Sequence, residues 1–168
     1  MRVLVDGVGS RPLADRVAAA LTRPVVRVSA DDFLRPAGER FEWGREDEQS
    51  FRERWLDEGA LRREVLEAEA AVLPRLWDAD RDRSARSTPT PWPANGVLLV
   101  DGVLLLGRGL PAELTVHVSL SPKALARQGV PSWQLPVFAA YDDEVRPAQV
   151  CDVLVRAEDP LRPAALFR

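Results

Sequence analysis

The sequence predicts a three-layer α/β domain with about five mostly parallel strands and helices on both faces of the sheet. The first 30 residues follow the order strand, turn, helix, strand, which is a βαβ unit. An unbroken apolar run at 97–100 is typical of a strand that is buried on both faces. Two further strand-like runs follow at 114–120 and 152–155. These three observations together favour a parallel sheet.

The elements of the first half follow from periodicity and from turn residues. The apolar run 2–5 predicts the first strand, and the apolar spacing that follows it predicts a helix that stops before Pro24. The β-branched run 25–28 predicts the second strand. After a polar loop we expect a helix from Gln49, and a helical apolar stripe that continues to about Leu73.

The second half alternates strands with polar segments. Residues 78–96 are rich in Arg, Asp, Ser, Thr and Pro and have no periodicity, so we expect an exposed loop there. A short helix is predicted over 122–128, irregular structure over 129–143, and a last helical turn or two over 144–150. We expect residues 1–168 to form a single domain.

Composition excludes several classes of function. The net charge of −3 provides no electrostatic footprint for nucleic acid or for an anionic membrane surface. No apolar run approaches the ~20 residues of a membrane span, and no signal-peptide pattern opens the chain, so we expect a cytoplasmic protein. Cys151, His117 and Lys123 are each the only residue of their type, which excludes a Cys-based zinc site and a two-histidine site. The oligomeric state stays open.

Acidic residues stand at the predicted carboxyl ends of three strands. They are Asp6, the pair Asp31 and Asp32, and Asp101. Ligands of open parallel sheets bind beyond these strand ends. Each acidic residue taken alone is explained as a turn former, but the three positions together favour a binding site.

Five segments, in this order, resemble the uridine kinase family of P-loop kinases. Residues 4–7 resemble the strand entering the phosphate loop, 28–33 a Ser-x-Asp-Asp-Phe motif, and 35–44 an Arg-rich loop. Residues 99–105 resemble a Walker B strand, and 135–155 the stretch that includes the last strand. The resemblance implies a P-loop NTPase-like fold. It also implies phosphoryl transfer from Mg-ATP to a nucleoside or a similar small hydroxyl acceptor.

The resemblance assigns roles to individual residues. It implies that Asp31 is the general base on the attacking hydroxyl and that Asp101 orients the magnesium shell through water. It places the donor phosphates at Gly7, Gly9, Ser10 and Arg11. The acceptor side would include Asp32 and Phe33, with Arg40 and Arg45 in the loop that follows. Arg127 would belong to the lid, which acts on the donor phosphate.

The pattern is broken on the donor side. A working phosphate loop reads G-x-x-x-x-G-K-[ST], in which backbone N–H groups and the Lys hold the phosphates. Here the stretch from Gly7 is about three residues shorter, the Lys is absent, Arg11 is the nearest cation, and Pro12 removes one N–H. The lid is also truncated, to 127–134, and retains one arginine, Arg127.

Three hypotheses follow from this pattern. The first is a divergent Mg-ATP-dependent kinase in which Arg11 replaces the Lys. The second is a non-catalytic protein, a pseudokinase, that binds a nucleoside or nucleotide and needs no cofactor. The third is a protein-interaction module, because Trp92 lies in a Pro-rich loop where an exposed ring could anchor a partner. The donor-side losses favour kinase activity that is weak or lost, and whether the protein is an enzyme stays open.

Overall fold

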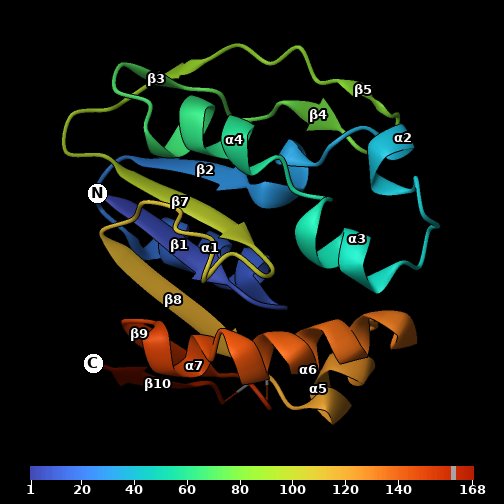
Figure 1. Ribbon diagram of the computed structural model, residues 1–168. Coiled ribbons are helices and arrows are strands. Elements are labelled where there is room, and N and C mark those ends of the chain that lie inside the picture. The colour runs from blue at the N-terminus through green and yellow to red at the C-terminus, as the bar shows by residue number, and fades with distance from the viewer. Residues whose placement is uncertain (160–161) are drawn as a thin grey trace.

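A six-stranded sheet forms the centre of the protein (Figure 1). The computed structural model describes residues 1–159 and 162–168. The strand order is β10-β9-β8-β1-β7-β2, and all neighbouring strands are parallel except β9 and β10. The strands are β1 (Arg2–Asp6), β2 (Val25–Ser29), β7 (Val97–Gly102), β8 (Leu114–Ser119), β9 (Val153–Arg156) and β10 (Ala164–Phe167). The predicted α/β class and all five predicted strands are therefore confirmed.

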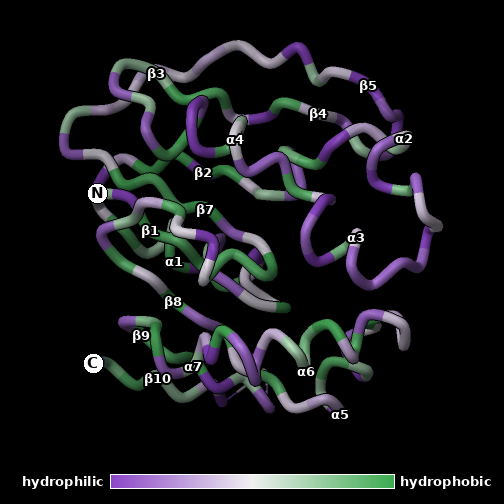
Figure 2. Tube along the Cα trace, in the orientation of Figure 1, coloured by the Kyte–Doolittle hydropathy of each residue, from purple (hydrophilic) through white to green (hydrophobic). Residues whose placement is uncertain are grey.

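Helices cover both faces of this sheet. They are α1 (Ser10–Ala20), η1 (Ala30–Phe33), α2 (Ala37–Arg40), α3 (Glu48–Glu53), α4 (Glu58–Leu61), η2 (Arg62–Leu66), α5 (Pro122–Arg127), η3 (Ser132–Gln134), α6 (Leu135–Glu144) and α7 (Pro147–Val150). Strand alternation explains the layers, because Val3 and Val5 pack with Ala14 of α1 while Leu4 packs with Leu61 of α4. The central strands β1 and β7 are mostly hydrophobic, whereas hydrophilic residues are frequent in the peripheral segments around α2 and α3 (Figure 2).

Two short ribbons lie above the main sheet. β3 (Ala71–Val72) pairs with β6 (Thr90–Pro91), and β4 (Trp77–Asp78) pairs with β5 (Arg83–Ser84), both antiparallel. The segment 78–96, for which we expected a loop, contains β5 and β6 and is mostly exposed.

Two predicted segments are wrong. The helical stripe ends at Leu66 instead of about Leu73, because the chain turns there and Ala71–Val72 pairs with β6. The segment 129–143 is mostly helical instead of irregular, since it contains η3 and most of α6. Val137, Phe138 and Tyr141 of α6 are buried, so tertiary packing stabilises a helix whose periodicity is weak.

The end of the chain also differs from the prediction. The final helical turn is confined to α7, because Arg146 adopts a left-handed conformation with φ of 54° and separates α7 from α6. A sixth strand, β10, follows, and no strand was predicted there. All of its residues are exposed. The strand therefore lacks the alternation of apolar and polar residues by which a half-buried strand is predicted.

The aromatic ring suggested as a partner anchor packs against the protein. Trp92 is half-buried against the core, and the Arg2 guanidinium lies 5.1 Å from the centre of its ring. None of the helices in the described parts of the chain has the length and apolar character needed to cross a bilayer.

Gly7 occupies a position that other residues can adopt only with strain. Its φ is +105°, and a Cβ built there would lie 2.5 Å from the Val118 carbonyl oxygen. We therefore expect Gly7→Ala to lower the free energy of unfolding by at least about 2 kcal/mol, measured by urea denaturation. Gly38→Ala is the control, because nothing lies within 4 Å of its Cβ position. This substitution should slightly raise the free energy of unfolding, since it reduces the freedom of the unfolded chain within α2. Equal stabilities of the two variants would contradict this account.

Candidate functional site

The carboxyl edge of the sheet brings two of the three acidic strand ends together. Asp101 lies beside Ser29 and Val5 in the parallel register, and Asp31 follows β2 in η1. Asp6 is paired with Gly102 instead, so its side chain points to the opposite face of the sheet from that of Asp101. The edge facing α1 therefore holds Asp31 and Asp101 without Asp6.

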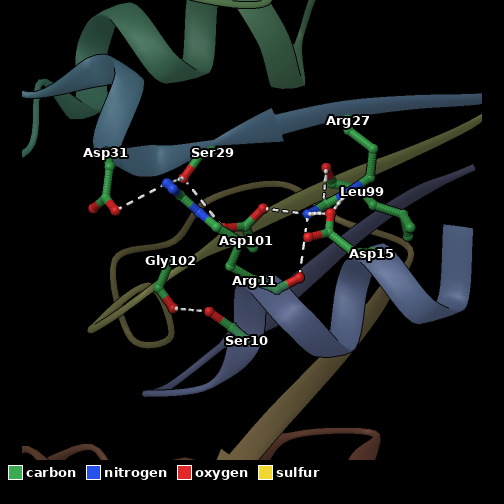
Figure 3. A network of polar contacts seen from close by, with 9 residues as sticks. All are labelled: Ser10, Arg11, Asp15, Arg27, Ser29, Asp31, Leu99, Asp101 and Gly102. Carbon is green, nitrogen blue, oxygen red and sulfur yellow. Dashed lines mark hydrogen bonds and ion pairs between the residues drawn. The ribbon is translucent and has the colours of Figure 1, made fainter. Parts of the chain in front are cut away.

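Arg11 joins these two carboxylates (Figure 3). Its Nη2 donates to the Ser29 hydroxyl at 2.7 Å and to Asp31 Oδ2 at 3.1 Å, and its Nε lies 3.6 Å from Asp101 Oδ2. The side chain reaches this position from the first turn of α1. A guanidinium thus lies between the two side chains that the sequence analysis assigned to the acid–base and magnesium roles.

Asp101 is buried, and its carboxylate is fully engaged by the protein. Its side chain is 3% exposed, and Oδ1 lies 2.8 Å from Arg27 Nη2. Oδ2 accepts from the Ser29 hydroxyl at 3.1 Å and faces Arg11. Arg27 is held in turn by Asp15, at 2.9 Å. A buried carboxylate requires such partners, and here two guanidinium groups and a hydroxyl supply them.

Asp31 differs from Asp101 because its side chain is 65% exposed. Partial desolvation at the edge raises the pKa of its carboxyl group, the Arg11 charge opposes this shift, and the Asp101 charge adds to it. A raised pKa makes a carboxylate a better proton acceptor. Asp31 can therefore accept a hydrogen bond, or a proton, from a hydroxyl group that approaches from solvent.

The loop between β1 and α1 consists of three residues, Gly7, Val8 and Gly9. The N–H groups at the two ends of this loop are hydrogen-bonded within the protein. The Gly7 N–H donates to the Gly102 carbonyl at 2.9 Å, and the Ser10 N–H donates to the Gly7 carbonyl at 3.0 Å. The Ser10 hydroxyl also donates to Gly102 O, at 3.1 Å. These donors are directed into the protein, whereas a phosphate loop directs its N–H groups at the phosphates.

The other predicted site residues lie apart from this network. Asp32 pairs with Arg75, with 2.7 Å between the carboxylate and Nε. Phe33 is fully buried in the core. Arg40 is buried too, its guanidinium lies 5.5 Å from the Trp55 ring centre, and burial lowers its pKa. The remaining two arginines make local contacts, with the Phe41 ring for Arg45 and with the Glu158 carbonyl for Arg127.

A small cavity opens beside Asp31, between η1, α3 and the loop after β7. Its volume is about 100 Å³, and its lining includes Phe51, Trp55 and Arg108. The Phe51 and Trp55 rings meet edge to face at 5.0 Å. None of these three residues was predicted to belong to a site. The helical spacing of Phe51 and Trp55 was visible, but nothing in the sequence places α3 against η1.

A second polar network lies on the opposite face, around the buried Asp6. Asp6 Oδ1 accepts the Leu105 N–H at 2.8 Å, while Oδ2 lies 2.7 Å from His117 Nδ1 and accepts the Tyr141 hydroxyl at 3.0 Å. Burial beside this carboxylate strongly raises the pKa of Tyr141, so its hydroxyl stays protonated. The Tyr141 hydroxyl also accepts the Leu106 N–H at 2.9 Å. The network fastens α6 to the end of β1 and is structural.

Comparison with known proteins identifies the fold. No family model matches the chain, and no curated protein matches it. A possible uridine kinase from Bacillus stearothermophilus has a similar structure, with a TM-score of 0.75, 16% identity, and coverage of 92% of this chain and 87% of the other. A candidate fructose transport system kinase from Silicibacter sp. TM1040 follows, with a TM-score of 0.62, 17% identity, and coverage of 90% and 85%. The YGR205w protein has a TM-score of 0.55 and 9% identity, with coverage of 100% of this chain and 90% of the other. These likenesses establish a P-loop kinase-like fold.

The network around Asp6 predicts an effect on stability. Tyr141→Phe should lower the free energy of unfolding by about 1–3 kcal/mol, because it leaves the buried Leu106 N–H and Asp6 carboxylate short of a partner. Urea denaturation measures this loss. Thr115→Val is the control, since it deletes a hydroxyl that bonds to Asp152 at the exposed surface. A loss no larger than that of the control would contradict the structural role.

Proposed function

We propose that this chain is a non-catalytic relative of the P-loop nucleoside kinases, and that it binds a nucleoside or a similar small hydroxyl-bearing molecule beside Asp31 without transferring phosphate. One observation carries the proposal. The Arg11 guanidinium bridges Asp31 and Asp101, 3.1 Å from the first and 3.6 Å from the second. An attached cation thereby stands at the position where a kinase of this fold would need a metal-bound triphosphate.

The donor side of the site does not fit a Mg-triphosphate. The Asp101 oxygens are engaged by Arg11, Arg27 and Ser29. The N–H groups at both ends of the short loop donate to carbonyls, and Pro12 has none to offer. Phosphoryl transfer depends on positioning and on neutralising phosphate charge, and these are the contributions that the missing groups would supply.

The acceptor side keeps groups that suit a small polar ligand. The exposed Asp31 carboxylate can accept a hydrogen bond from a ligand hydroxyl, and Phe51 and Trp55 offer apolar ring surface beside it. At about 100 Å³ the cavity is smaller than the roughly 300 Å³ at the lower end of ligand pockets. It can therefore enclose one ring of a nucleoside, and the remainder would lie in the open mouth near Asp31.

The first test compares turnover with binding. We expect no phosphorylated product, by ³¹P NMR, when the protein is incubated with Mg-ATP and uridine or cytidine. We expect saturable binding of one of these nucleosides by isothermal titration calorimetry, with or without Mg-ATP. Product formation would instead favour the divergent kinase with Arg11 in place of the Lys, and then Arg11→Ala should abolish turnover. Absence of both product and nucleoside binding would overturn the proposal.

The second test asks whether the bound ligand contacts Asp31. Asp31→Ala should weaken nucleoside binding at least about tenfold, because a hydrogen bond to a charged group is worth about 1.5–3 kcal/mol. Asp15→Ala is the matched control, since Asp15 is also an exposed carboxylate paired with an arginine of the same network. We expect the Asp15→Ala variant to bind the nucleoside with an affinity within twofold of that of wild type. Equal losses in both variants would place the ligand elsewhere.

The third test concerns the role of Arg11 as an internal cation. Removing it leaves Asp31 and Asp101 facing each other without the positive charge between them. We therefore expect Mg²⁺ to raise the melting temperature of Arg11→Ala by several degrees, and that of wild type by no measurable amount. Arg16→Ala removes an exposed arginine of the same helix and should behave as wild type. An equal response of all three proteins would contradict this role.

A further inference from the structure

A larger cavity lies on the β4–β5 ribbon, and none of its lining residues belongs to the Arg11 network. The ribbon itself lies next to α2 (Figure 1). The volume of the cavity is about 360 Å³, which falls within the range of small-molecule sites. Its lining includes Asp78, Ser84 and four arginines. The arginines are Arg75, Arg81, Arg83 and Arg86. The ribbon brings them together because Asp78 pairs with Arg83 and Trp77 with Ser84.

Two of these arginines are matched by carboxylates. The Asp78 side chain is 10% exposed, accepts the Arg81 N–H at 3.2 Å, and lies 3.4 Å from Arg81 Nη1 and 3.7 Å from Arg75 Nη2. Arg75 also pairs with Asp32. The Arg81 N–H, with the charges of Arg75 and Arg81, holds the pKa of the Asp78 carboxyl below its usual range. Asp78 therefore stays ionised at neutral pH, with both of its arginines close by.

The other two arginines have no such match. Within residues 1–159 and 162–168, no carboxylate lies within 4 Å of the guanidinium of Arg83 or Arg86. The nearby Asp82 does not line the cavity, because its carboxylate accepts the Ala37 N–H at 2.7 Å and the Trp77 indole N–H at 3.1 Å. The cavity thus carries two uncompensated positive charges.

The turn that carries Arg86 has an unusual backbone conformation. Arg86 adopts a left-handed conformation, with φ of 51°, and its N–H donates to the Ser84 hydroxyl at 3.4 Å. This region of backbone conformation is unfavourable for residues other than glycine. This turn places Arg86 in the lining of the same cavity as Arg83, so two positive charges line one space.

We propose that this cavity binds the phosphate group of a small molecule. Two uncompensated guanidinium groups balance the two charges of a phosphate monoester, and the planar fork of arginine can bind phosphate oxygens bidentately. The Ser84 hydroxyl offers a further donor. The proposal does not depend on nucleoside binding at Asp31, because it uses a different cavity and different side chains.

Isothermal titration calorimetry with three anions tests this site. The anions are inorganic phosphate, pyrophosphate and glycerol 3-phosphate, so that a free anion, a diphosphate and a phosphate monoester are compared. We expect saturable binding of at least one of them, and a loss of at least tenfold in affinity for Arg83→Ser/Arg86→Ser. Lys123→Ser/Arg156→Ser is the control, because it removes the same charge from two exposed positions elsewhere and should stay within twofold of wild type.

Two results would overturn the proposal. One is the absence of saturable binding for all three anions. The other is an equal loss in the test and control variants, which would mean that the anions respond to net charge alone. Arg83→Lys/Arg86→Lys provides a second variant if the serine substitutions disturb the ribbon, since it keeps the charge and removes only the bidentate fork. We expect it to bind more weakly than wild type, and unchanged affinity would contradict specific recognition by arginine.

Discussion

The parallel register between β1 and β7 determines which polar groups can meet at the carboxyl edge of the sheet. Val5 lies beside Asp101, and Asp6 lies beside Gly102. Because side chains alternate between the faces, Asp101 points toward α1 and Asp6 points toward α6. A slip of one residue would exchange the two carboxylates, and each would then lose its partners. The candidate site and the buried network that anchors α6 are thus two results of the same pairing.

Arg11 gives this edge a positive charge that does not have to be bound from solution. A metal ion that neutralises two carboxylates must bind from solution, whereas a guanidinium attached to α1 is always present at the site. It also occupies the space and the lone pairs that an incoming cation would use. The P-loop kinase-like fold is therefore retained together with a carboxyl edge whose acidic groups are already neutralised by the protein.

The sequence was sufficient for the five parallel strands of the sheet, but it predicted neither the exposed strand β10 nor the contacts at the carboxyl edge. Buried strands such as 97–100 leave a continuous apolar signal, and the loss of the Lys near Arg11 was visible by simple comparison with the motif. Nothing in the sequence showed that Arg11 would turn toward Asp31, because the direction of a long side chain depends on the packing of α1 against β7. Helix α6 was missed for a similar reason, since its stability comes from Tyr141 and its neighbours in the core.

The charges around Asp101 form a line in which the sign alternates. It runs from Asp15 to Arg27, Asp101, Arg11 and Asp31, with successive distances of 2.9, 2.8, 3.6 and 3.1 Å. Loss of a terminal member leaves a line that still alternates and is neutral. Loss of an interior member brings two like charges next to each other in a partly buried place. On charge balance alone, the two ends of the line therefore tolerate substitution over evolutionary time, while the three interior positions can change only together. Ligand binding, as proposed above, constrains Asp31 further and leaves Asp15 as the end that can vary.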